Sequence, residues 1–190
     1  MNVLHIDSCA LGDHSSSRQS TAAIASLIAA NQQATVRYRD LAASPLSHAS
    51  GPLLQALSER WNANIPMNAE LRAEVLQSAS LLQEFMEADV VLIGAPMHNF
   101  SVPSTLKAWL DRLLELRSTM DGKRLSAMRV LLATSGCTDV STGAMLDLHE
   151  TQLLAVFRSL GVGQVSVVHN SLSLDLQPAA GLETGFKAAA

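Results

Sequence analysis

Three consecutive serines, Ser15 to Ser17, precede a segment with helical periodicity and are the first residues that could do chemistry. The start of a helix presents unpaired backbone N–H groups and the positive end of the helix dipole, and hydroxyls there favour a bound anion. A single N-cap residue explains one serine but not three. The loop has neither the Gly-Lys-Ser/Thr of a nucleoside triphosphate site nor a G-x-G-x-x-G dinucleotide pattern. The serines therefore predict a phosphate site suited to a mononucleotide.

A second candidate is the loop Met97-His98-Asn99-Phe100, which follows the apolar run Val90–Ile93. Pro103 is expected to begin the next helix, because proline is tolerated in the first helical turn. Ligands of open α/β sheets bind beyond the carboxyl ends of strands, where these four side chains fall. Of the six histidines, His98 is the one that we expect to touch a ligand.

The third candidate loop, residues 135–143, is small, polar and glycine-bearing. At Gly136 the backbone could approach a flat ligand closely, with Ser135 beside it. An ordinary turn leading into the next helix is the alternative. We expect all three loops to meet at one edge of a sheet, since each follows a predicted strand.

These loops are positioned by strands that alternate with helices. The predicted strands are Asn2–Asp7, Thr35–Asp40, Val90–Ala95, Arg129–Thr134 and Gln164–His169. Helical periodicity begins near Ser17, runs over Leu71–Met86, follows Pro103 to about Leu116, and spans Leu146–Leu160. The alternation predicts an α/β three-layer sandwich with a five-stranded parallel sheet in the flavodoxin-like order 2-1-3-4-5 and helices on both faces.

Residues 41–68 do not fit a simple strand–helix unit, although Leu53–Trp61 has a short helical pattern. A connection of this length often serves as a lid or a subunit contact, and ordinary surface structure is the alternative. We find no repeat or second domain, so residues 1–190 are expected to form a single domain.

Composition narrows the class of protein. The chain is 48% hydrophobic and 16% charged, with a formal net charge of −4. No apolar run is long enough for a membrane span, and the N-terminus lacks a signal-peptide pattern, so we expect a cytoplasmic protein without a membrane partner. No cluster of Lys and Arg is present to neutralise phosphates, which argues against nucleic acid. Two cysteines, Cys9 and Cys137, are too few for a disulfide framework.

Several kinds of function are excluded because the residues that they need are absent. A phosphoacceptor receiver domain needs an aspartate at the end of its third strand, where this chain has Ala95-Pro96. A serine hydrolase of α/β type needs G-x-S-x-G, which is absent. The histidines and cysteines show no metal-ligand spacing, so no metal site is expected.

The run from Pro96 to Asp111, PMHNFSVPSTLKAWLD, resembles the FMN-dependent NADH:quinone oxidoreductases, or azoreductases, of the flavodoxin-like fold. Further matching motifs are the S-x-S-R ending at Arg18, the R-D-L of residues 39–41, the G-K-R of residues 122–124 and the Leu160-Gly161 step. The resemblance covers essentially the whole chain.

This resemblance implies two-electron transfer from NADH or NADPH through FMN to a quinone, or to an azo compound, in ping-pong fashion. It also implies a homodimer. Ser15, Ser16 and Ser17 would hold the FMN phosphate, with Cys9 where the family usually has a serine. Met97, His98, Asn99 and Phe100 would line the isoalloxazine ring, and Ser135 and Gly136 would approach its pyrimidine side. No catalytic side-chain base is implied, because the flavin carries the redox chemistry.

The chain also departs from the family. His98 replaces the usual tyrosine, Cys137-Thr138 alters the third loop, and the segment between Leu116 and Gly122 is shorter than usual. An aromatic wall of the substrate site is therefore missing or supplied from elsewhere, for example by Trp61 of a second subunit. Two alternatives stay open: a flavin- or ligand-binding module with little turnover, and an NAD(P)H:FMN reductase that releases reduced FMN.

Overall fold

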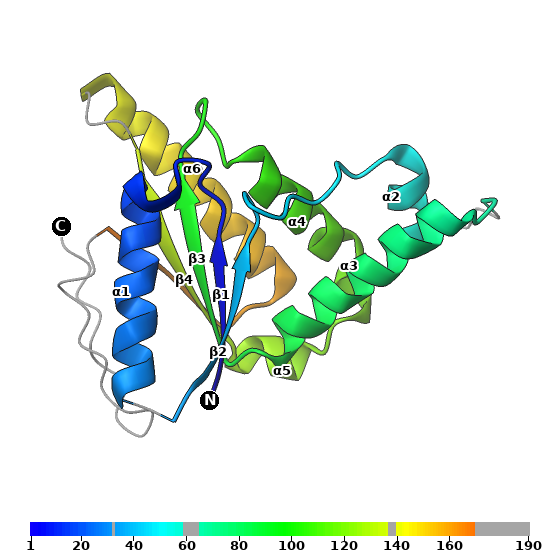
Figure 1. The fold of residues 1–190 in the computed structure, drawn as a ribbon, viewed down its shortest axis with the longest axis horizontal. Helices are drawn as coiled ribbons and strands as arrows, with labels where there is room; N and C mark the ends of the chain where they lie inside the picture. The colour runs from blue at the N-terminus through cyan, green and yellow to red at the C-terminus, as the bar shows by residue number, and fades with distance from the viewer. Residues whose placement is uncertain (32, 59–64, 137–139, 170–190) are drawn as a thin grey trace.

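The computed structural model describes residues 1–31, 33–58, 65–136 and 140–169, which form a parallel sheet covered by helices (Figure 1). The strands are β1 (Asn2–Asp7), β2 (Thr35–Asp40), β3 (Val90–Pro96), β4 (Arg129–Ser135) and β5 (Gln164–Val168). Their order is β2-β1-β3-β4-β5 and every pairing is parallel, which confirms the predicted topology. The third and fourth strands each run one residue further than predicted, and the fifth ends one residue earlier.

The helices are α1 (Ser16–Asn31), α2 (Gly51–Leu57), α3 (Ala69–Glu87), α4 (Ser104–Glu115), α5 (Gly122–Ala127) and α6 (Val140–Leu160). Two short 3-10 helices, η1 (Gly12–His14) and η2 (Arg117–Thr119), precede α1 and α5. Pro103 is the N-cap residue of α4, not its first helical residue as predicted. The helical pattern at Leu53–Trp61 forms α2, which begins two residues earlier and ends at Leu57; residues 59–64, including Trp61, lie outside the described residues.

Alternate residues of the central strands face opposite helical layers. On one face, α1 packs through Ile24 and Ile28 against Val3, Leu92 and Leu131. On the other face, α3, α4 and α6 pack against a larger core that includes Ile6, Ile93 and Leu132. The buried aromatic side chains of this second layer come from all three helices: Phe85, Trp109 and Phe157. Continuous burial along β3 explains why its sequence is apolar without alternation.

Residues 41–68 lead away from the sheet. Figure 1 shows α2 and the start of α3 standing apart from it on the side of α4. A small satellite core of Leu53, Leu57 and Leu71 holds α2 against α3. No helix among the described residues is long and apolar enough to cross a membrane.

Gly94 of β3 lies directly opposite Asp7 of β1, and a Cβ at this position would stand 2.5 Å from Asp7 Oδ1. We therefore expect Gly94→Ala to destabilise the protein by roughly 1–3 kcal/mol, the cost of overpacking a filled site. The urea midpoint of unfolding measures this effect. Gly51→Ala is the control, since a Cβ at Gly51 meets no atom within 4 Å. Equal midpoints for the two variants would show that Asp7 can move aside freely.

Candidate functional site

Parallel pairing brings the three predicted loops to the carboxyl edge of the sheet. Asp7 and Gly94 are register partners at the ends of β1 and β3, and Pro96 pairs with Ser135 at the ends of β3 and β4. The N–H of Met97 donates to the carbonyl of Ser135 at 2.7 Å. A Cβ at Gly136 would lie 3.3 Å from Cε of Met97, so the glycine allows the second and third loops to pack closely. The predicted meeting of the loops is confirmed for these residues.

The three serines differ in their placement. Ser15 and Ser17 are buried, at 3% and 1% exposure, while Ser16 is exposed. Their hydroxyl oxygens, Ser15 Oγ and Ser17 Oγ, are 2.9 Å apart. Ser15 Oγ also accepts from the N–H of Arg18 at 3.3 Å, which makes Ser15 the N-cap of α1. The structure thus places two hydroxyls side by side at a helix N-terminus, which is a suitable donor set for an anion.

The loop after β3 forms a tight two-residue turn. His98 and Ser101 exchange backbone hydrogen bonds, with N–O distances of 2.7 and 3.0 Å. Asn99 and Phe100 at its tip have φ angles of +46° and +68°. Asparagine adopts the left-handed region more readily than other non-glycine residues, but for a bulky phenylalanine it is a strained conformation. Phe100 is 73% exposed, so the strained turn presents a large apolar side chain to solvent at the sheet edge.

Cys9 is the second residue of the loop that leads from β1 to the serines, and it is a buried free thiol. Its neighbour Ser8 donates from its hydroxyl to the Gly94 carbonyl at 2.7 Å, which ties the loop to β3. The Ser8 carbonyl accepts from the Thr105 hydroxyl of α4 at 3.4 Å. The first loop is therefore anchored to both elements that flank the second loop.

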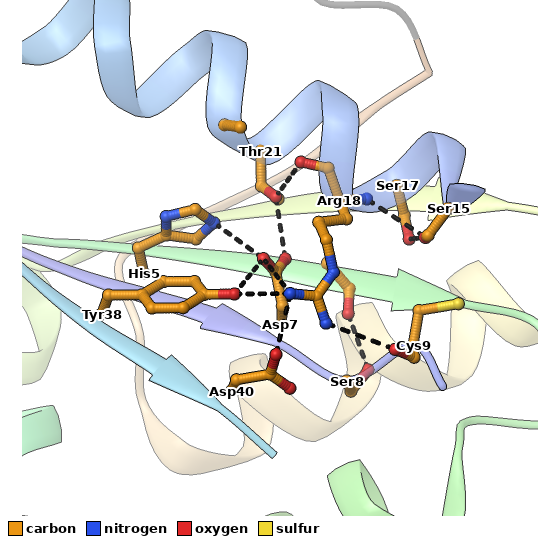
Figure 2. Close-up of polar contacts among 12 residues, drawn as sticks. His5, Asp7, Ser8, Cys9, Ser15, Ser17, Arg18, Thr21, Tyr38 and Asp40 are labelled. Atoms are coloured by element: carbon orange, nitrogen blue, oxygen red, sulfur yellow. Dashed lines mark hydrogen bonds and ion pairs between the residues drawn. The ribbon is translucent and has the colours of Figure 1, made fainter. Parts of the chain in front are cut away.

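A polar network that sequence reasoning missed lies at the end of β1, next to the serine loop (Figure 2). The register sets Asp7 opposite Asp40 and His5 opposite Tyr38. Asp7, only 1% exposed, accepts from Thr21 Oγ1 at 2.8 Å and from the Tyr38 hydroxyl at 3.0 Å. The sequence carries one signal of this network, since two adjacent strands both end in aspartate.

Arg18 lies at the centre of this network, and Figure 2 shows its guanidinium between Tyr38, Asp7 and Asp40. The Asp40 carboxylate, which accepts from Arg18 Nη1 at 2.8 Å, raises the pKa of Arg18. Burial raises the pKa of Asp40, but hydrogen bonds from Arg18 and two backbone N–H groups outweigh burial and lower it. Burial, with the nearby Asp7, raises the pKa of Tyr38 to about 12. At neutral pH the network therefore holds a charged arginine, a charged Asp40 and a neutral tyrosine.

His149 of α6 also contacts the site and was not predicted to do so. It is 2% exposed, and its Nε2 lies 2.9 Å from the Ala95 carbonyl, just before the Met97–Phe100 loop. This contact joins α6 to the end of β3. His98, by contrast, is half-buried in the turn. Cys137 and residues 138–139 of the third loop lie outside the described residues.

No group of three or more metal-ligating side chains occurs within the described ranges.

The family model for the flavodoxin-like fold matches residues 1–187. An FMN-dependent NADH:quinone oxidoreductase of Methylocella silvestris is 44% identical over 181 residues, which cover 88% of this chain and 86% of that protein. A second protein with this name, from Bradyrhizobium diazoefficiens, is 44% identical over 173 residues, which cover 85% of this chain and 83% of that protein.

Among solved structures, an FMN-dependent NADH-azoreductase from Bacillus anthracis in complex with FMN superposes with a TM-score of 0.70 at 21% identity. The superposition spans 92% of this chain and 90% of that protein. At this identity the likeness concerns the fold, and it agrees with the sheet order described above.

Proposed function

Because this chain belongs to the family of FMN-dependent NADH:quinone oxidoreductases, we propose that it passes two electrons from NADH or NADPH to a quinone through FMN held at the carboxyl edge of its sheet. FMN supplies the hydride-transfer chemistry when it is bound, so the protein has to bind, orient and shield it. One observation carries the proposal: the buried hydroxyl pair of Ser15 and Ser17 and the strained turn at Phe100 follow neighbouring strands.

The residues at the edge fit this cofactor. Ser15 and Ser17, with the N-terminal N–H groups of α1, would hold the phosphate, and exposed Ser16 would add only its backbone N–H. Cys9 lies at the base of the same loop. Since its thiol is a weaker donor than the usual serine hydroxyl, Cys9 would contribute packing more than hydrogen bonding.

The second and third loops would hold the ring system. Met97, His98, Asn99 and Phe100 would lie along the isoalloxazine, and the backbone of this turn would orient it. Ser135 and Gly136 would face the pyrimidine side, where the glycine leaves room for close approach. We infer a ping-pong order, in which the nicotinamide leaves before the acceptor enters the same slot.

Addition of FMN to the purified protein, followed by flavin fluorescence, tests the proposal. Quenching should saturate at one FMN per chain. Without a quinone, NADH should be oxidised only once per bound FMN, and continued NADH oxidation should require the quinone. A protein that binds FMN without turnover would be a binding module, and release of reduced FMN during turnover would identify an FMN reductase. Absence of quenching would contradict the flavin site itself.

Acceptor preference should reflect the short connection between α4 and α5, which consists of η2 and a few flanking residues. The family resemblance implies a longer segment here that carries an aromatic wall of the substrate site, and a chain without that wall would hold a large planar acceptor less well. We expect kcat/KM for a benzoquinone to exceed that for an azo dye by at least tenfold. Steady-state NADH oxidation with each acceptor measures the ratio. A higher value for the dye would contradict this interpretation of the short connection.

We also propose a homodimer and a cytoplasmic location. Leu11 and Phe100, in the loops after β1 and β3, are large apolar side chains at 61% and 73% exposure, and a second copy could cover them. Light scattering on a sizing column would give the mass. A monomer at all concentrations would contradict the dimer.

A further inference from the structure

Arg18 contacts both ends of the loop between β1 and α1. Its backbone N–H donates to Ser15 Oγ at 3.3 Å, and its Nη2 donates to the Cys9 carbonyl at 3.3 Å. The two contacts therefore clasp residues 9–15, which include both ends of the phosphate loop proposed above. Arg18 is itself only 15% exposed in its side chain, so the clasp is shielded from water.

The guanidinium is in turn fixed to the sheet. Arg18 Nη1 lies 2.8 Å from Asp40 Oδ2, 2.7 Å from the Tyr38 hydroxyl and 3.9 Å from Asp7 Oδ2. Asp40 and Tyr38 belong to β2, and Asp7 to β1 (Figure 2). A chain of contacts thus runs from two paired strands, through one side chain, to the loop.

Charge gives Arg18 a second role. Asp7 and Asp40 have side-chain exposures of 2% and 19%, so solvent screens them poorly. The guanidinium offsets one of these two negative charges beside the serine loop. Without it, two poorly screened carboxylates would repel a phosphate dianion, whereas a neutral ligand would feel little change.

We propose that Arg18 is a positioning residue for the phosphate of the cofactor: it clasps the loop from Cys9 to Ser15 and offsets the charge of Asp7 and Asp40. The inference rests on the proposed FMN site. It predicts that Arg18 separates FMN from riboflavin, which has the same ring system but no phosphate. A residue that only supported the fold would affect the two flavins alike.

The experiment compares dissociation constants for FMN and riboflavin, measured by fluorescence quenching, in the native protein, Arg18→Gln and Arg18→Lys. The ratio of the riboflavin constant to the FMN constant should fall at least tenfold in Arg18→Gln. This variant loses the side-chain contact to the Cys9 carbonyl and the positive charge, while its backbone N–H still donates to Ser15. Arg18→Lys keeps the positive charge, but a single ammonium group cannot reproduce the separate contacts of Nη1 with Asp40 and Nη2 with Cys9. Its ratio of dissociation constants should lie between those of Arg18→Gln and the native protein.

Arg39→Met is the matched control. Arg39 is the β2 neighbour of Asp40 and pairs through two nitrogens with Glu84 of α3, away from the loop. The ratio of the riboflavin constant to the FMN constant in Arg39→Met should equal that of the native protein.

A ratio in Arg18→Gln within twofold of the native ratio, which would mean that the affinities for FMN and riboflavin fall alike, would overturn the proposal. If Arg18→Gln does not fold, a native ratio of the two constants in Arg18→Lys would overturn the proposal instead. A native protein that binds neither flavin would instead refute the proposed function.

Discussion

Replacing Ser17 with alanine should weaken FMN binding by about 10- to 100-fold while the fold stays intact. A hydrogen bond to a charged group contributes roughly 1.5–3 kcal/mol, and every 1.4 kcal/mol corresponds to a factor of ten. Ser17 Oγ is buried and lies 2.9 Å from Ser15 Oγ. Ser15, not Ser17, accepts the capping hydrogen bond from Arg18, so the helix start survives the change.

Fluorescence quenching by added FMN measures the loss, and Ser26→Ala is the matched control. Ser26 lies on the same helix, but its hydroxyl donates to the Ala22 carbonyl and faces solvent. Its FMN affinity should equal that of the native protein. If Ser17→Ala also retains native affinity, the phosphate does not bind at the Ser15–Ser17 pair, even if FMN binds elsewhere.

The fold could be predicted from sequence because its signals are local. Each strand is a short apolar or alternating run, and each long helix repeats its apolar residues with a period near 3.6. Strand ends were accurate to within one residue, since Pro96 and the polar residues after Ser135 stop the apolar runs. The short α5 was missed because six residues carry too little periodicity to be recognised.

The site was only partly predictable, because part of it depends on which residues the sheet sets opposite each other. The Asp7–Asp40 and His5–Tyr38 pairs arise from the register of β1 with β2, for which the sequence carries only one signal, the aspartate that ends both strands. His149 reaches Ala95 from a distance of 54 residues along the chain. The left-handed conformation of Phe100 runs against the preference of its own residue type.

The contrast between Ser15 and Ser16 shows the same limit. Sequence treats three consecutive serines as equivalent, but the helical turn buries the first and third and exposes the second. The three hydroxyls differ in their exposure to solvent once α1 packs onto the sheet. A site residue can therefore be predicted by type and place, while its role follows from packing.

Arg112→Met should have the largest effect on stability, about 3 kcal/mol. Arg112 of α4 is fully buried and donates to Ser78 Oγ at 2.8 Å, to Ser47 Oγ at 2.9 Å and to Glu74 Oε2 at 2.6 Å. It thereby joins α4 to α3 and to the connection after β2. Removing one partner of a buried ion pair costs roughly 3–5 kcal/mol, and the 28% exposure of Glu74 favours the lower end of that range.

The pH dependence identifies the cause of this loss. Burial raises the pKa of Glu74, but hydrogen bonds from Arg112 and Ser47 outweigh burial and lower it below its usual range. A carboxyl group with a lowered native pKa stabilises the fold above its unfolded pKa and loses that contribution as the pH falls. The gap in unfolding free energy between native protein and Arg112→Met should therefore be smaller at pH 3 than at pH 7, with the decrease below the ordinary carboxyl pKa of 4.5.

Urea unfolding at both pH values measures the gap, with two comparison variants. Arg37→Met breaks an exposed pair, Arg37–Glu87, whose side chains are 55% and 45% exposed, and should change stability by less than about 0.5 kcal/mol. The double variant Arg112→Met/Glu74→Gln removes the charge left behind and should recover part of the loss. If the double variant is no more stable than Arg112→Met, and the gap does not depend on pH, the loss comes from the packing of the long side chain and not from the ion pair.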